Sequence, residues 1–294
     1  MIRYILLALL SLSVYNTYGC NACGCGVSAG YVGGGHQSGT YAGIAYAYRA
    51  FHTRPSSGAS SQESFQRMDL KVGWQWNKWS QVRVNIPYMY TQQSTGEEQI
   101  MNSGLGDVST MLFFSLTSLL NSELPYSIYL GGGVKMPTGE YLAIQNGLWL
   151  NPNLQVGRGS WDFPLYASLE RNWDAINLAL DLGYTINGEN RLNYRFGNQL
   201  QSTLRVYKNL SQNSLSKIID VGGFVEHYGY NREKGTEIFE TQGSLMGGQG
   251  GFSLESERFR LGAFAKFPIW QSLFQGQVQS KPAVQINLSV RLLK

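Results

Sequence analysis

The sequence has 294 residues, a net charge of +4 and no break in composition, so its length permits either two soluble domains or one large β unit. Glycine (35), tyrosine (18) and phenylalanine (13) are frequent and only 14% of residues are charged, which favours aromatic-rich strands. The slightly negative mean hydropathy excludes a bundle of membrane-spanning helices, each of which needs about 20 apolar residues. No dense run of lysine or arginine indicates a nucleic-acid surface.

The first residues have the features of a secretory signal peptide. Arg3 precedes an apolar stretch over residues 4–12, and the small residues Thr17 and Gly19 stand three and one positions before a cleavage point after residue 19. A short membrane anchor is the alternative, but the apolar stretch is too short to cross about 30 Å of hydrocarbon. We therefore expect a signal peptide over residues 1–19 and export to an oxidising envelope compartment.

A cysteine-rich and glycine-rich leader is expected over residues 20–39. Cys20, Cys23 and Cys25 form a C-x-x-C-x-C motif, and His36 follows in the glycine-rich part. Three interpretations stay open. Cleavage before Cys20 would give a lipidated N-terminus, although the leucine-like residue that usually stands three places upstream is missing. Closely spaced thiolates with His36 as a fourth ligand would suit Cu or Zn. In the third interpretation one pair forms a disulfide or all three cysteines are incidental.

The clearest strand pattern lies in residues 67–77, where Met68, Leu70 and Val72 alternate with charged residues. Residues 81–90 alternate in the same way after a four-residue turn at 77–80. A period of two is typical of a β-strand with one apolar and one polar face. Together the two segments predict a β-hairpin.

The same period recurs along the rest of the chain, so we predict twelve strands. The other ten cover residues 41–51, 106–116, 126–136, 162–170, 176–185, 194–207, 219–228, 243–254, 259–267 and 284–292.

The connections between these strands alternate between two classes. The short class covers residues 77–80, 117–124, 172–174, 208–215 and 255–257, and the longer class covers 52–64, 91–103, 137–160, 187–193, 231–242 and 269–282. An even number of strands with short turns at one end and longer loops at the other is typical of a bacterial outer-membrane barrel. The alternative is a soluble β-sandwich, but its strands average about 5 to 6 residues and its connections are not sorted by length. We therefore predict an all-β fold, a 12-stranded antiparallel transmembrane barrel over residues 40–294.

If the apolar face meets lipid, the polar face lines the lumen. The charged residues predicted to line it are Arg49, Arg67, Asp69, Lys71, Arg83, Asp107, Lys135, Glu170, Asp181, Arg195, Arg205, Asp220, Glu226, Arg260, Lys266 and Arg291. One interpretation is a salt-bridged filling that holds the barrel rigid, and the other is a solute path with a mild preference for anions.

Catalysis finds little support, so we predict no enzyme and no catalytic residue. Histidine occurs at three positions only, and no nucleophile elbow, paired-histidine helix or phosphate loop is present. A barrel phospholipase would need a serine beside an outward histidine at the outer rim, and His227 is the one candidate for that histidine.

Two motifs carry a resemblance to a known family. Gly104-Leu105-Gly106-Asp107 and, later, Lys135-Met136-Pro137-Thr138-Gly139 resemble the outer-membrane family called "putative MetA-pathway of phenol degradation". The cysteine motif with residues 159–162 and 194–198 further resembles uncharacterised Bacteroidetes barrel proteins that begin with a cysteine-rich leader. The resemblance implies a transporter-like barrel that passes small solutes, including aromatic or hydrophobic compounds.

The sequence thus leads to two functional hypotheses. The first is a porin-like outer-membrane channel for small solutes, with outer-membrane lipid and the barrel-insertion machinery as partners and no nucleic acid. The second is a plugged structural or metal-handling outer-membrane protein that acts through its cysteine-rich leader. One departure is that outer-membrane barrels commonly end in an aromatic residue, whereas this chain ends in Leu292-Leu293-Lys294.

Overall fold

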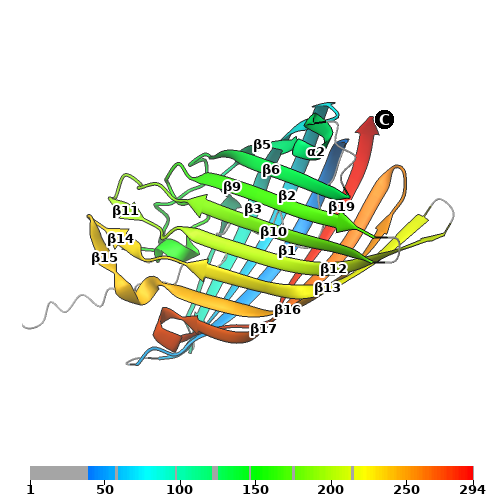
Figure 1. The fold of residues 1–294 in the computed structure, drawn as a ribbon. Coiled ribbons are helices and arrows are strands. Elements are labelled where there is room, and N and C mark those ends of the chain that lie inside the picture. Colours follow the sequence, from blue (N-terminus) through cyan, green and yellow to red (C-terminus); the bar gives the residue numbers. More distant parts are fainter. Residues whose placement is uncertain are drawn as a thin grey trace, which may run out of the picture.

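A computed structural model of the protein describes residues 39–56, 59–96, 98–120, 125–145, 147–173, 176–212 and 215–293. The chain forms a closed β-barrel of twelve antiparallel strands, in which each strand pairs with its neighbours in sequence (Figure 1). The wall closes where β1 (Thr40–Thr53) pairs with β19 (Ala283–Leu293). The predicted 12-stranded up-and-down barrel is therefore confirmed.

The other strands of the wall follow in chain order. They are β2 (Ser61–Asn77), β3 (Ser80–Thr95), β4 (Glu98–Leu105) continued by β5 (Ser109–Ser115), β6 (Tyr126–Lys135), β9 (Phe163–Asn172), β10 (Asn177–Ile186), β12 (Gln199–Gln212), β13 (Leu215–Tyr228), β16 (Gly243–Glu255), β17 (Phe259–Leu273) and β18 (Val278–Ser280), which precedes β19 on the same side of β1.

The connections between the barrel strands contain short elements of secondary structure. They are the hairpin β7 (Ile144–Gln145) and β8 (Leu148–Trp149), the small sheet of β11 (Tyr194–Arg195), β14 (Asn231–Glu233) and β15 (Thr236–Ile238), the helix α2 (Leu116–Leu119) and the 3-10 turns η2 (Pro152–Leu154), η3 (Phe239–Thr241) and η4 (Phe274–Gly276). Within the described residues, no helix combines the length and the apolar character needed to cross a membrane.

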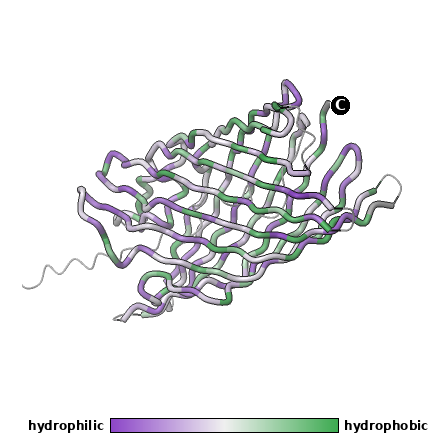
Figure 2. The backbone as a smooth tube through the Cα atoms, in the orientation of Figure 1, coloured by the Kyte–Doolittle hydropathy of each residue, from purple (hydrophilic) through white to green (hydrophobic). Residues whose placement is uncertain are grey.

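The period-two pattern of the sequence sets which side chains face outward. On β2, Met68 and Leu70 are exposed on the outside of the wall, whereas Asp69 between them is fully buried inside the barrel. Because the outer face is apolar over most strands, its exposed side chains match a hydrocarbon environment. Apolar and polar residues alternate along the strands in Figure 2, and polar residues gather at the tips of several loops.

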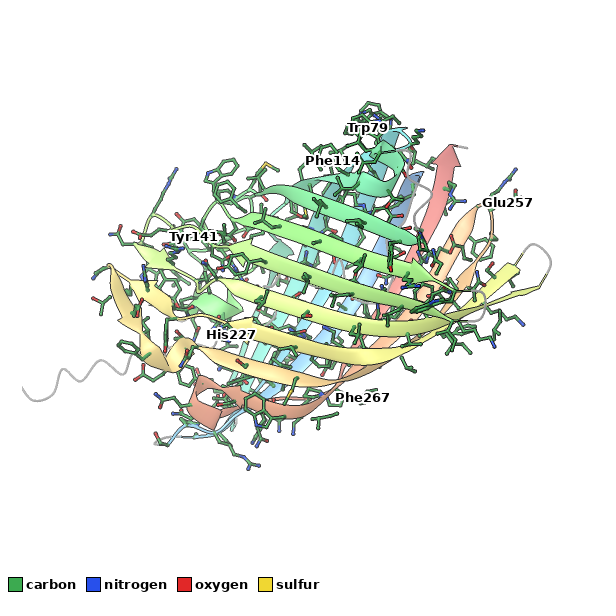
Figure 3. All side chains as sticks on the ribbon, in the orientation of Figure 1. Trp79, Phe114, Tyr141, His227, Glu257 and Phe267 are labelled. Atoms are coloured by element: carbon green, nitrogen blue, oxygen red, sulfur yellow. The ribbon has the colours of Figure 1, made fainter. Side chains whose placement is uncertain are left out.

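Aromatic side chains lie near the end of the barrel that carries the short turns. The rings of Trp79 and Phe114 stack with centroids 6.1 Å apart, as Figure 3 shows near the β2–β3 turn. That turn is held by the Asn77 side chain, whose Oδ1 accepts hydrogen bonds from the backbone N–H of Trp79 and Ser80 at 2.9 and 2.7 Å. Such rings at the rim are typical of an interfacial girdle.

Several predicted strand boundaries were wrong, since β2 (Ser61–Asn77), β13 (Leu215–Tyr228) and β17 (Phe259–Leu273) all extend past their predicted limits. Residues 91–103 were expected to be a loop, but β3 and β4 continue as a hairpin with register from Tyr88↔Leu105 to Thr95↔Glu98. The outward positions Gln92 and Ser94 are polar there, so the alternation that indicates a strand disappears from the sequence although the backbone pairing continues.

The prediction that Arg195 lies in a barrel strand and lines the lumen was wrong. The barrel strand β12 begins only at Gln199, and Arg195 lies in β11, paired with Arg232 in the small sheet outside the wall. The chain turns before this point, because the side-chain oxygen of Asn190 accepts hydrogen bonds from the backbone N–H groups of Leu192 and Tyr194. The alternation of residues in the sequence does not reveal this turn.

Candidate functional site: the lumen and its inward loop

The long connection between β6 and β9, residues 136–162, folds back into the barrel, and we call it the inward loop. Its base is held by Asp107, which lies in the break between β4 and β5. The Asp107 carboxylate accepts one hydrogen bond from the backbone N–H of Gly139 at 3.0 Å and one from that of Arg158 at 2.9 Å. One buried carboxylate therefore holds both arms of the loop, because Gly139 lies on the outgoing arm and Arg158 on the returning arm.

Close glycine contacts bring the two arms together. A Cβ atom on Gly157 would lie 2.3 Å from the carbonyl oxygen of Gly139, which no real Cβ contact tolerates. Thr138 adds a second link, because its hydroxyl accepts from the backbone N–H of Val108 at 2.8 Å and donates to the carbonyl of Gly106 at 3.0 Å. The two sequence motifs at 104–107 and 135–139 thus meet in space and form the anchor of the inward loop.

A second carboxylate, Asp162, closes the base of the loop just before β9 begins. Its Oδ2 lies 2.5 Å from the Lys135 ammonium and 3.7 Å from the Arg158 guanidinium. Burial by itself would raise the pKa of the Asp162 carboxyl, but these two cations outweigh burial and hold the pKa below its ordinary value. The negative charge of Asp162 is therefore part of the anchor at neutral pH.

The returning arm of the loop, at Leu154, reaches across the mouth of the barrel. The Leu154 carbonyl accepts hydrogen bonds from the Thr91 hydroxyl at 2.7 Å and from the Asn102 amide at 3.1 Å, on β3 and β4. The Leu154 side chain enters an apolar cluster whose other members come from β1, β2, β13, β16, β17 and β18. The cluster consists of Phe51, Phe65, Leu154, Phe224, Tyr228, Leu245, Leu273 and Val278, with Ile100 and Phe274 packed against it. The loop thus narrows the lumen at the end that carries the long connections.

An ion-paired layer lies directly against the apolar cluster. Glu226, fully buried on β13, contacts the Arg49 guanidinium at 2.6 Å and the Lys266 ammonium at 2.7 Å. Its Oε2 also accepts the hydroxyl hydrogen of Tyr228 at 2.6 Å, and Lys266 lies 4.5 Å from the centre of the Phe224 ring. Because each buried charge has a partner, this layer carries only a small net charge.

Further polar clusters lie deeper in the lumen. Asp181 accepts hydrogen bonds from Tyr166 at 2.6 Å and Ser168 at 2.8 Å, and it pairs with Arg205 at 2.8 Å. Across the barrel, Asp69 pairs with Arg67 at 2.7 Å. Paired charges of this kind favour, at these levels of the lumen, the interpretation of a salt-bridged filling that holds the barrel rigid.

The family model described as "Putative MetA-pathway of phenol degradation" matches residues 47–267. The chain belongs to this family. The Gly-Asp and Pro-Thr-Gly motifs that carried the resemblance in the sequence both lie within the matched range, at the anchor of the inward loop. A comparison with curated proteins gave no match.

Solved structures that resemble this family member include an outer-membrane channel and the translocator domain of an autotransporter. An outer-membrane channel of Pseudomonas putida F1, termed COG4313, aligns with a TM-score of 0.62 at 12% identity over 87% of this chain and 96% of that chain. The translocator domain of the autotransporter NalP from Neisseria meningitidis aligns with a TM-score of 0.47 at 9% identity over 88% and 90%. At these identities the likeness of the channel shows the fold alone, so the family member has the outer-membrane type of barrel.

The remaining predicted lumen residues lie at several levels of the barrel. Arg83 lies over the Phe113 ring at 4.1 Å, and Arg291 lies 3.6 Å from Glu255 at the end with short turns. The others are Lys71 on β2, Glu170 on β9, Asp220 on β13 and Arg260 on β17. In the described part of the chain, no carboxylate lies within 4 Å of the charged groups of Lys71 and Arg260. The described lumen therefore contains two cationic side chains that do not belong to an ion pair.

His227 lies on the outer face of β13, near the end with long connections (Figure 3). Its Nδ1 lies 2.8 Å from the Ser244 hydroxyl, so the serine that a hydrolase would need stands beside it. Among the described residues, however, no carboxylate or amide bonds to Nε2 and orients the ring. The pair therefore lacks the third group of an activated nucleophile.

Residues 1–19 and the predicted metal ligands Cys20, Cys23, Cys25 and His36 lie outside the described residues. Where the chain is described, no group of three His, Cys, Asp or Glu side chains is placed to hold a metal ion.

The residues that sequence reasoning missed are those of the inward loop and the apolar cluster. Phe51 and Phe65 gave a signal, because each occupies an inward position of its strand next to the predicted lumen residues Arg49 and Arg67. An aromatic residue on the polar face of a barrel strand indicates a contact inside the lumen. Leu154 had no such signal, because it lies in a loop without periodicity.

Proposed function

We propose that this protein is a bacterial outer-membrane channel for small solutes, and that the inward loop forms its constriction. The observation that carries the proposal is the apolar cluster around Leu154, which lies across the mouth of a barrel whose deeper lumen is polar. A barrel that served only as a rigid support would need no long loop anchored by two buried carboxylates. The name of the family and that of the Pseudomonas putida channel support the same role.

The preferred solutes are small, neutral and aromatic or otherwise hydrophobic. Side chains of the cluster, including Phe51, Phe65 and Phe224, offer apolar surface to a solute at the mouth. In the layer below, one carboxylate, Glu226, compensates part of the charge of Arg49 and Lys266, and among the described residues no negative group there is left to attract a cationic solute. A neutral ring therefore loses less hydration free energy than an ion of the same size at this level.

The first experiment measures single-channel conductance in planar bilayers. The test variant replaces residues 142–155 by a short glycine-serine linker, which is feasible because the backbone N–H of Gly157 already bonds to the Glu140 carbonyl at 2.8 Å. The control variant replaces only residues 144–149, an exposed hairpin that leaves Leu154 in place. We expect a several-fold rise in conductance for the first variant and no change for the second. Absence of conductance in both variants and in the natural protein would refute the proposal.

The second experiment tests the solute class. Benzyl alcohol, a neutral aromatic alcohol, should interrupt the ion current of the natural channel, whereas mannitol at the same concentration should not. The Phe224→Ser variant should lose this interruption, which separates binding in the lumen from an effect of the alcohol on the lipid. Equal responses to both solutes would contradict the aromatic preference and leave the channel itself standing.

A further inference from the structure

The outer face of the barrel carries a groove that the proposed channel does not use. It has a volume of about 410 Å³ and lies over the ends of β1, β2 and β3 that carry the long connections. The floor follows from the strand register, in which His52 pairs with Gln62 and Gln62 with Ser94. These side chains alternate with inward ones such as Phe51, so they point out of the barrel.

The groove is cationic. Arg54 and Lys281 stand exposed at its rim, and His52 lies on the floor. The Arg54 Nε donates a hydrogen bond to the His52 Nε2 at 2.8 Å, which leaves the two terminal guanidinium nitrogens without a partner among the described residues. The one acidic residue along the groove, Glu63, is buried and already accepts hydrogen bonds from Thr53 and Gln93.

Its floor is rich in hydrogen-bond donors. Gln62 and Gln92 supply amide groups, and Ser64 and Ser94 supply hydroxyl groups. Guanidinium and ammonium groups with neutral donors around them are the usual partners of a phosphate attached to a sugar.

The height of the groove on the barrel identifies the source of such a ligand. Tyr48 lines the lower edge of the groove, Tyr46 and Tyr88 lie below it on the same strands, and Ile44 and Leu70 lie below these on the apolar outer face. Tyrosines at the edge of an apolar band mark the level of the lipid headgroups. The groove begins at this level, where Tyr48 lines it, and extends toward the long connections, which face the outside of the cell in this type of barrel.

We propose that the groove binds the phosphorylated sugar headgroup of a glycolipid in the outer leaflet of the outer membrane. Arg54 and Lys281 contact the phosphate, and the amides and hydroxyls of the floor contact the sugar. The β1–β2 hairpin that carries the groove projects beyond the neighbouring strands (Figure 1), so it reaches the headgroup layer. This inference needs the outer-membrane placement of the barrel but does not need channel activity.

The test measures binding of diphosphorylated lipid A to the purified full-length protein in neutral detergent. The test variant is Arg54→Ser with Lys281→Ser, and the control variant is Arg191→Ser with Arg258→Ser. The control removes the same charge from exposed positions elsewhere. Each interfacial cation contributes about fivefold, so we expect the test variant to bind about 30-fold more weakly and the control to bind as the natural protein does. Heat-dependent mobility on gels verifies that each barrel is folded.

Four outcomes would overturn the proposal. Equal affinity of the test variant and the natural protein would remove the groove as the site. Equal losses in test and control variants would show attraction by overall charge. Competition by inorganic phosphate at concentrations similar to those of the lipid would make free phosphate the ligand. A dephosphorylated lipid A that binds as tightly as the diphosphorylated form would remove the phosphate contact.

Discussion

The anchor of the inward loop can be weakened by one substitution, Asp107→Asn. The amide keeps the shape of the carboxylate and can still accept from one backbone N–H. Its NH₂ group, however, is a hydrogen-bond donor and faces the second backbone N–H, which is also a donor, so no hydrogen bond can form there. The variant therefore loses one charge-assisted hydrogen bond and weakens the second bond and the contact with Lys135, whose ammonium lies 3.7 Å away.

The expected size of the effect follows from these contacts. A hydrogen bond to a charged group is worth about 1.5–3 kcal/mol, and a buried donor left unpaired adds to the loss. If the free energy that favours the anchored, closed loop over the released, open loop falls by about 2–4 kcal/mol, the ratio of closed to open molecules falls by about 30-fold to 1000-fold. The open probability in planar bilayers should rise accordingly.

The matched control is Asp220→Asn. It also removes one buried carboxylate from the barrel interior, but Asp220 lies on β13, and among the described residues no hydrogen bond or ion pair joins it to the inward loop. We expect its open probability to equal that of the natural protein. If Asp107→Asn leaves the open probability unchanged, the loop is not held by this carboxylate. If both variants raise it equally, the effect comes from lumen charge and the reasoning on the anchor is refuted.

Three further predictions concern other parts of the site. Replacing Glu226 by Gln leaves two buried cations without their shared partner, so the free energy of unfolding in urea should fall by about 3–5 kcal/mol, while exposed Glu257→Gln should change nothing. Gly157→Ala should displace the loop and raise conductance, because its Cβ has no room, whereas Gly183→Ala, with no atom within 4 Å, should not. Since the pKa of Asp162 is lowered by folding, its contribution is fully present above the ordinary pKa of about 4 and is lost as pH falls from there through the lower pKa of the folded state. Open probability should therefore rise on acidification toward pH 3 in the natural protein, and an Asp162→Asn variant that kept the full pH response would contradict this assignment.

Much of the barrel could be predicted because its pattern is local. Residues 67–77 alternate strictly, and the structure has a strand over that whole range within β2. Prediction failed where the outward residues turned polar, as at Gln92 and Ser94, because a paired strand above the membrane has no apolar face to reveal it. It failed again at Arg195, where an asparagine-capped turn interrupts the alternation before β12 begins.

The charged side chains of the candidate site could be named from the sequence, but their pairing could not. Arg49 and Glu226 are both inward by alternation, yet 177 positions separate them, and only closure of the barrel brings their charges to 2.6 Å. The motif residues Asp107 and Gly139 could be recognised as turns, whereas their shared hydrogen bond requires the break between β4 and β5.

The sequence by itself thus determined the strands and the direction of most side chains, because a period of two assigns each residue to one face of a sheet without reference to any distant residue. Only the tertiary structure decided what fills the mouth of the lumen. Leu154 has no periodic neighbours to place it, and its position depends on Thr91, 63 residues away, and on an apolar cluster assembled from strands at both ends of the chain. Contacts of that kind exist only after the barrel has closed.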